Sequence, residues 1–245
     1  MSYLGNINYN NFGSKMEIIE YRGYDDIDIY FEEYNYIVKN RTVGDFKKGK
    51  VSCPYERRVC NVGYFGELNY KDNPIAYKFW ENMIRRCYDG FNLSKHTTYI
   101  GCIVCEEWQS FENFTEWFNE NYYEIEGEKM CLDKDILVHG NKIYSPSTCI
   151  FAPQRINTLF VKKDMNRGDL PIGVHWDKSR NKYKSTWRDF NSKTKSKRFN
   201  TIQEAFDCYK YNKEKIIKQV ADEYKPYIPK KLYDAMYRYE VEITD

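Results

Sequence analysis

The sequence predicts an α+β fold built from several small modules along its 245 residues. Alternation of polar and apolar residues, typical of half-buried strands, occurs near the start of the chain and again after residue 170. Helical spacing of apolar residues occupies the middle and also follows the second group of strands. We therefore expect a small N-terminal β-barrel-like module, a central strand–strand–helix core with flanking helices, and a C-terminal three-stranded sheet packed on one helix.

The expected boundaries follow these changes in pattern. We place the β-rich module at 14–67, the central core at 68–163, the sheet with its helix at 169–224, and a short helical tail at 225–245. The polar stretch Met165–Asp169 predicts the linker before the sheet. A chain of this length accommodates several small modules more easily than one large core.

Three strand-like segments, at 16–21, 27–31 and 36–39, predict the N-terminal module. Later short segments up to residue 66 bring the expected number of strands to about five, in a small meander or barrel. An acidic run between Asp25 and Glu33 does not suit a DNA-binding face. We therefore expect this module to act as a scaffold or to contact another protein.

Two amphipathic helices are predicted in the central core, with a short strand between them at 99–105. The apolar stripe of the first helix consists of Trp80, Met83, Ile84 and Cys87. The stripe of the second helix consists of Phe111, Phe114, Trp117 and Phe118. Both helices are expected to bury these aromatic faces in the core.

The segment after residue 170 alternates with a period of two. In its middle strand, Lys182, Lys184, Thr186 and Arg188 are expected on one face and Tyr183, Ser185 and Trp187 on the other. The sequence Thr201–Glu204 then has the form of a capping box and predicts the start of a long helix. A sheet with an aromatic face on a helix and a cationic face left open suits an anionic partner.

Charge is distributed unevenly along the chain. Residues 164–218 hold 14 Lys and Arg against 7 Asp and Glu, a net charge of +7, whereas the whole chain has a net charge of +2. This asymmetry favours a dedicated surface for nucleic acid, with double-stranded DNA as the expected partner. A solvated lysine-rich surface without a ligand is the alternative.

The pattern over Leu170–Lys218 resembles the plant ethylene-response-factor type of DNA-binding domain. The resemblance depends on Gly173–Val174, the aromatic and basic middle strand, and the segment Phe199–Phe206. It implies that the sheet lies in the major groove, where arginine and tryptophan side chains contact bases and phosphates. The positions that correspond to DNA contacts are His175, Arg180, Lys182, Lys184, Arg188, Lys197 and Arg198.

The centre of the chain has the order strand, glycine–asparagine loop, strand and helix. The segments that carry it are Cys131–Leu137, Gly140–Asn141, Ile143–Phe151 and Gln154–Asn157. This layout resembles the His-Asn-His (HNH, or His-Me finger) nucleases. With the upstream motifs Trp80–Tyr88 and Cys105–Phe114, the chain resembles phage-encoded homing-endonuclease-like proteins over nearly its whole length.

This resemblance implies a metal-dependent DNA endonuclease that uses Mg²⁺ or another divalent ion and a general base. By position, Asp133 takes the metal-ligand place and Lys134 takes the place of the usual histidine base, with Asn157 near the third position. His139 could replace the base if the loop folds back, and Asp135 could also bind the metal. The alternative is that Asp133 and Asp135 only form a capped turn at the end of a strand.

Eight cysteines in a chain of this length do not form a dense disulfide framework. The spacing of Cys53 and Cys60 before Cys102 and Cys105 does not match a zinc site, so we expect buried thiols rather than structural zinc. No run approaches the ~20 apolar residues of a membrane span, and the N-terminus has no secretory signal. We expect a cytoplasmic protein of an infected bacterial cell.

Three functions stay open from the sequence. The first is a homing-type endonuclease whose basic sheet positions the cut. The second is a DNA-binding regulator that retains the fold but lacks catalysis, which the missing histidine favours. The third is a phage anti-defence protein whose acidic N-terminal module contacts a protein of the host or of a phage.

Overall fold

A computed structural model describes residues 2–95, 97–161 and 170–244. It shows a mixed α+β chain divided into two compact units, of which the first comprises residues 1–120 with 142–145 and the second residues 121–141 with 146–245. The linker expected at Met165–Asp169 lies outside the described residues. Within the described ranges, no helix combines the length and the apolarity needed to cross a membrane.

The first unit begins with an antiparallel meander in the order β1-β2-β3-β4. The strands are β1 (Ile7–Tyr9), β2 (Lys15–Gly23), β3 (Asp26–Phe31) and β4 (Tyr36–Arg41). Within the described residues β1 pairs only with β2 and β4 only with β3, so the sheet stays open. The expected barrel is therefore wrong, because four short strands are too few to close on themselves.

The expected later strands of this module are also absent from the described residues, because the chain turns into helix α1 (Val43–Lys47) after β4. The side chain of Thr42 caps α1 by accepting a hydrogen bond of 3.0 Å from the amide of Asp45. The helix covers the apolar face of the meander, where Ile27, Ile29 and Phe31 are fully buried. Local capping thus decides the conformation of a segment whose composition suits a strand.

The acidic run of the meander is partly neutralised by one arginine. The guanidinium of Arg22 lies 2.7 Å from Asp26 and 2.6 Å from Asp28. These hydrogen bonds lower the pKa of both carboxyl groups, so both aspartates stay ionised at neutral pH. The exposed surface of this run is consequently less acidic than its sequence indicates.

The rest of the first unit is helical and is centred on tryptophan. The predicted helices are α2 (Pro74–Tyr88) and α5 (Phe111–Asn121), and both are confirmed. The indole of Trp80 is fully buried and donates a hydrogen bond of 2.8 Å to the carbonyl of Trp108. Shorter elements complete this part: η1 (Glu32–Tyr34), η2 (Tyr70–Asp72), α3 (Gly90–Lys95), η3 (Thr97–Tyr99), β5 (Ile103–Val104), α4 (Glu106–Gln109) and β7 (Ile143–Tyr144).

The second unit begins with the strand–strand–helix element expected at the centre of the chain. Strand β6 (Met130–Asp133) pairs antiparallel with β8 (Ile150–Pro153), and helix α6 (Gln154–Leu159) follows directly. Asp133 pairs with Ile150 at the end of β6 where the long loop begins. The order strand, loop, strand and helix is present, but the segment expected as one strand over 143–151 is divided between Ile143–Tyr144, which pairs with Ile103–Val104, and β8.

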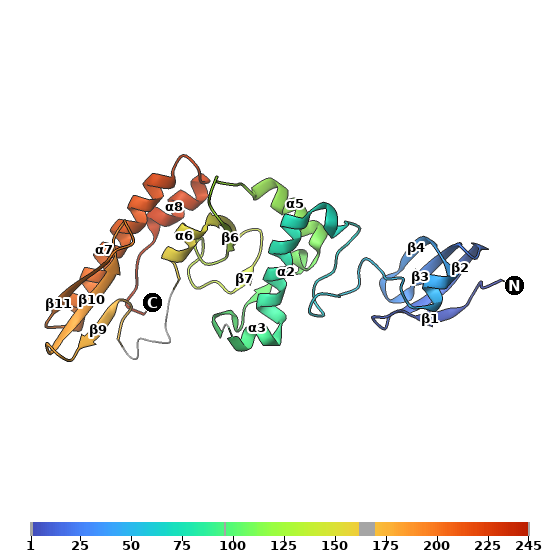
Figure 1. Ribbon diagram of the computed structural model, residues 1–245, viewed down its shortest axis with the longest axis horizontal. Helices are drawn as coiled ribbons and strands as arrows, with labels where there is room; N and C mark the ends of the chain where they lie inside the picture. The colour runs from blue at the N-terminus through green and yellow to red at the C-terminus, as the bar shows by residue number, and fades with distance from the viewer. Residues whose placement is uncertain (1, 96, 162–169, 245) are drawn as a thin grey trace. The chain divides into compact units, whose positions relative to one another are not determined.

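A three-stranded antiparallel sheet of order β11-β10-β9 follows and lies along the long helix α7 (Figure 1). Its strands are β9 (Val174–Asp177), β10 (Lys182–Arg188) and β11 (Thr194–Phe199). Helix α7 (Ile202–Tyr224) begins with the predicted capping box, in which Thr201 and Glu204 bind each other's backbone amides. The sheet-and-helix prediction for this region is confirmed.

One core joins the strand–strand–helix element to the C-terminal helices. Ile150 and Ile156 pack in the same cluster as Ile217 and Val220 of α7. Helix α8 (Lys230–Arg238) contributes Leu232 and Met236 to this cluster. A second cluster lies between the sheet and the first half of α7: Val174, Ala205, Phe206, Tyr209 and Val241. The second unit is thus organised around α7.

Candidate nucleic-acid interface and candidate active site

The strand register places most of the predicted DNA contacts on one face of the sheet. Lys184 lies opposite His175 on β9 and opposite Arg198 on β11, and paired residues point to the same side of a sheet. Lys182 and Arg188 share this side because they alternate with Lys184 along β10. The face that bears His175, Lys182, Lys184, Arg188 and Arg198 is called the open face below.

The opposite face of the sheet is buried against α7. Ser185 and Val174 pair with each other and are both fully buried. Tyr183, Trp187 and Phe199 of the same face pack against the cluster on α7. The aromatic and cationic sides therefore separate as the period-two pattern predicts, and the open face is the one that no described helix covers.

Several cations of the open face have partners of their own. Arg198 forms an ion pair of 2.8 Å with Asp177, whereas Lys182 donates a hydrogen bond of 2.7 Å to the neutral amide of Asn200. Hydrogen bonds from Ser179 and then from Arg198 lower the pKa of Asp177 to about 2. Asp177 therefore remains ionised and offsets the charge of Arg198.

The other two cations of the open face differ from Arg198. In the part of the chain that the structure describes, neither Lys184 nor Arg188 forms an ion pair or a side-chain hydrogen bond. Arg188 is exposed and Lys184 is half-buried among its neighbours. Lys182, Lys184 and Arg188 thus form a row along β10 in which no charge is offset by a carboxylate.

Two predicted contacts lie away from the open face. Lys197 pairs with Ser185, so it points to the helix side of the sheet, and its ammonium lies 5.4 Å from the ring centroid of Phe199. This corrects its assignment beside Arg198, because adjacent residues of a strand point to opposite faces. Arg180 lies in the exposed turn between β9 and β10. Both side chains are exposed and stand at the rim of the sheet.

In the strand–strand–helix element, the carboxylate of Asp133 accepts hydrogen bonds from backbone amides that follow it in the chain. One carboxylate oxygen, Oδ1, accepts hydrogen bonds of 2.7 Å from the amides of both Asp135 and Ile136. This is the capped turn that the sequence analysis kept as an alternative, and that interpretation is confirmed. Burial raises the pKa of Asp133, although the two amides act in the opposite direction.

The side chain of Lys134 also contacts residues of the loop after β6. Its buried ammonium lies 2.8 Å from the carboxylate of Asp135 and donates a hydrogen bond of 2.7 Å to the carbonyl of Asn141. The amide of Asn141 in turn donates to the carbonyl of Lys134. Lys134 therefore fastens the loop after β6, a structural role that accounts for a lysine at the place of the expected base.

The remaining candidates lie elsewhere in the element. His139 is exposed in the loop, with its ring centroid 5.9 Å from that of Tyr239, and Asn157 lies on α6. Among the described residues, no group of three or more His, Cys, Asp or Glu side chains is placed to hold a metal ion. The two predicted metal ligands thus have partners within the protein: Oδ1 of Asp133 caps the turn, and the carboxylate of Asp135 is bound by Lys134.

The cysteines all lie in the described part of the chain, and none forms a disulfide. Cys102 is buried and Cys105 is half-buried at the ends of β5. Burial raises the pKa of the Cys53 thiol to about 11, so this group stays protonated at neutral pH. The predicted burial of Cys87 is confirmed; Cys208, for which the helical pattern of α7 also suggests a buried thiol, is only partly buried.

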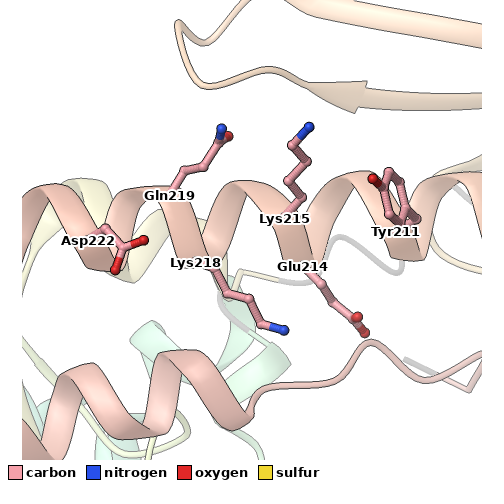
Figure 2. Close-up of a pocket in the computed structure, with 6 residues that line it drawn as sticks. All are labelled: Tyr211, Glu214, Lys215, Lys218, Gln219 and Asp222. Carbon is pink, nitrogen blue, oxygen red and sulfur yellow. The ribbon is translucent and has the colours of Figure 1, made fainter.

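A shallow groove of about 310 Å³ runs along the exposed side of α7 (Figure 2). Figure 2 shows Lys215 and Gln219 extending to one side of the helix and Glu214 and Lys218 to the other. With Asp222 at its end, the groove carries two lysines and two acidic residues. This balance of charge gives it no preference for an anionic or a cationic ligand.

One residue of interest was missed by the sequence analysis. Lys213 lies on the buried side of α7, four residues after Tyr209 and seven before Val220. Burial, and then the charge of Arg188, lower the pKa of Lys213 to about 8. The signal was available in the sequence, because a lysine interrupts the apolar stripe of the long helix.

Comparison with known proteins does not assign a function to these surfaces. Comparison of the chain with protein-family models, with curated proteins and with solved structures finds no match to any of them. The function proposed below is therefore inferred from the geometry of the second unit.

Proposed function

We propose that the protein binds double-stranded DNA through the open face of the sheet β9-β10-β11. The main support is the row Lys182, Lys184 and Arg188 on β10, whose charges are not offset by any described carboxylate. A two- or three-stranded ribbon fits the major groove, and cations spaced two residues apart on a strand can reach successive phosphates. Exposed His175 of β9 lies opposite Lys184 on the same face.

Electrostatics favours an anionic polymer over a small ligand for this face. Neither the groove on α7 nor the one beside α2 and α3 includes a residue of the open face. Small molecules bind in concave sites that enclose most of their surface. A flat cationic row suits a phosphate backbone instead, because binding then releases condensed counterions.

The proposal is for binding without cleavage. The contacts of Asp133 and Lys134 leave the predicted metal site without a suitable ligand set. A regulator that binds DNA therefore agrees better with the geometry than an endonuclease does. The protein-contact role of the N-terminal module stays a prediction, since Arg22 and its aspartates account for only part of that surface.

The test is a triple variant in which Lys182, Lys184 and Arg188 are replaced by alanine. We expect its affinity for a duplex of mixed sequence to fall at least about tenfold in 0.1 M salt, and the slope of log K against log salt to decrease by about 2 to 3. A matched control removes three exposed lysines of the first unit that have no described ion pair: Lys39, Lys50 and Lys71. It changes the net charge equally and should bind normally.

Equal binding by the triple variant and the control would contradict the proposal. Circular dichroism and thermal melting must first show that both variants keep the fold. Cleavage is examined in the same samples by incubating supercoiled plasmid with Mg²⁺ or Mn²⁺. Nicking by the wild type that Asp133→Ala abolishes would establish the endonuclease alternative over the regulator.

A further inference from the structure

A groove of about 250 Å³ lies beside the end of α2 in the first unit. Its lining comes from α2, α3 and η3 and is polar: Asn82, Arg85, Arg86, Asn92 and Tyr99. Among the described residues no carboxylate lines it, whereas the groove on α7 has two. Two guanidinium groups, two amides and a phenol thus line one recess, which is called the arginine pocket below.

The guanidinium of Arg85 is held by one carboxylate and keeps further donors for a ligand. Its Nε and Nη2 donate hydrogen bonds of 3.1 and 2.9 Å to Glu81, one turn earlier on α2. Asp89 forms an ion pair with Nη1 at 3.6 Å, which is too long for a hydrogen bond, and Nη1 donates to no other group in the described part of the chain. Glu81 therefore orients the planar group, while the N–H groups of Nη1 stay available to an anion.

Arg86 is placed in the pocket by two aromatic side chains. Its guanidinium carbon lies 5.6 Å from the ring centroid of Tyr99. It also lies beside the hydroxyl of buried Tyr144, whose pKa is raised by burial and lowered by the charge of Arg86. These neutral rings orient the guanidinium without cancelling its charge. Lys142 donates 3.2 Å to the carbonyl of Thr98, so a third cation lies near Tyr99.

The donors of the arginine pocket suit a phosphate group. Hydrogen bonds from a guanidinium to a phosphate are charge-assisted, and the unbridged phosphate oxygens can accept from several donors at once. The pocket is smaller than the ~300 Å³ at which sites for whole drug-sized ligands begin, so it fits one phosphate with the group attached to it. The ring of Tyr99 adds a surface on which a base can stack.

We propose that the arginine pocket binds a phosphate group, carried either by a free nucleotide or by a nucleic-acid strand. Arg85 and Arg86 supply the positive charge, and the amides of Asn82 and Asn92 add neutral donors. Asn82 is exposed and makes no side-chain hydrogen bond within the described ranges, so its amide can turn to the ligand. The site belongs to the first unit and does not depend on DNA binding by the open face.

The test variant is Asn82→Asp, which keeps the shape of the side chain and puts a carboxylate into the pocket. Both arginines remain, so any stabilisation that they give to the end of α2 is retained. We expect the affinity for 5′-AMP, measured by isothermal titration calorimetry, to fall at least about tenfold, because a donor is lost and like charges repel.

Asn119→Asp is the matched control, since Asn119 is exposed on α5 and lies outside the lining of the pocket. It adds the same charge to the same unit. Its affinity for 5′-AMP should stay within about twofold of the wild type, because salt screens distant charges at the surface.

A comparison of two ligands identifies the source of the phosphate. 5′-AMP and a short thymidine oligonucleotide are titrated into protein in which Lys182, Lys184 and Arg188 are replaced by alanine, so that the open face does not contribute. Tighter binding of 5′-AMP assigns the pocket to nucleotides, and tighter binding of the oligonucleotide assigns it to a strand. In either case Asn82→Asp in the same background must weaken the binding.

Absence of binding of both ligands to the folded protein would overturn the inference, as would equal affinities of the wild type and Asn82→Asp. If Asn82→Asp does not fold, Arg85→Gln removes one of the charges instead, and unchanged affinity in that variant overturns the inference as well. Failure of the open face in its own test leaves this result unaffected, because the two sets of substitutions lie in different units.

Discussion

The packing of the sheet on α7 depends on a glycine, and its replacement gives a sharp test of this arrangement. Gly173 precedes β9 with a φ of +75°, a conformation that residues with a Cβ rarely adopt. A Cβ placed on Gly173 would overlap the ring of Tyr209 on α7. The backbone of β9 therefore approaches the helix as closely as a glycine permits, and Gly173→Ala must displace one of them.

The expected loss of stability has two parts. The left-handed conformation costs an alanine about 1 kcal/mol, and forcing a methyl group into a filled contact costs roughly 2 kcal/mol more. Gly127→Ala measures the first part alone, because Gly127 has a φ of +76° and no atom within 4 Å of its Cβ position. We expect the free energy of unfolding to fall by about 3 kcal/mol in Gly173→Ala and by about 1 kcal/mol in Gly127→Ala.

Urea denaturation followed by tryptophan fluorescence measures both free energies of unfolding. The double variant Gly173→Ala with Tyr209→Ala supplies a further check, because truncation of the ring removes the overlap. In a protein that carries Tyr209→Ala, Gly173→Ala should lower the free energy of unfolding by no more than Gly127→Ala lowers it in the wild type. Equal destabilisation by Gly173→Ala and Gly127→Ala in the wild-type background would refute the close approach of β9 to α7.

Three other predictions concern the second unit. Thr201→Ala removes the capping box with Glu204 and should lower the free energy of unfolding by about 1 kcal/mol in urea. Arg155→Met, which removes the ion pair of 2.7 Å with Glu223 and the contact of the guanidinium with the ring of Phe190, should lower it by about 1 kcal/mol, mostly in low salt. The lowered pKa of Lys213 means that the unfolded chain binds this proton more tightly, so stability should rise between pH 8 and pH 10.5 by roughly 2 kcal/mol, given partial exposure. Titration of urea midpoints should show this rise in the wild type but not in Lys213→Met.

The sequence was sufficient to predict those features that depend on residues close together in the chain. The alternation in β10 depends on the pleat of a strand, and the start of α7 depends on Thr201 and Glu204, which are three residues apart. The same alternation rule could have separated Lys197 from Arg198, because two adjacent strand residues cannot share a face. Both residues were carried over by position from the resemblance, which takes no account of parity along β11.

The sequence was not sufficient to predict contacts between segments that are far apart in the chain. Closure of the N-terminal sheet depends on whether β1 reaches β4, which the apolar pattern of either strand does not report. The common core of Ile150 with Ile217 likewise joins segments more than sixty residues apart. Side-chain chemistry is harder still to predict, since Asp133 can cap a turn or bind a metal with the same neighbours in the sequence.

The common core has a consequence for how DNA binding relates to the strand–strand–helix element. Arg155 of α6 pairs with Glu223 of α7 and lies over Phe190 in the turn between β10 and β11. Helix α6, α7 and the tip of the sheet are therefore linked through one side chain as well as through the apolar cluster. In the proposed complex, a duplex held on the open face would keep a fixed relation to α6, because Arg155 contacts both α7 and the turn between β10 and β11. The strand–strand–helix element and the sheet that bears the open face are thus parts of one folded body, and the first supports the second through this shared core.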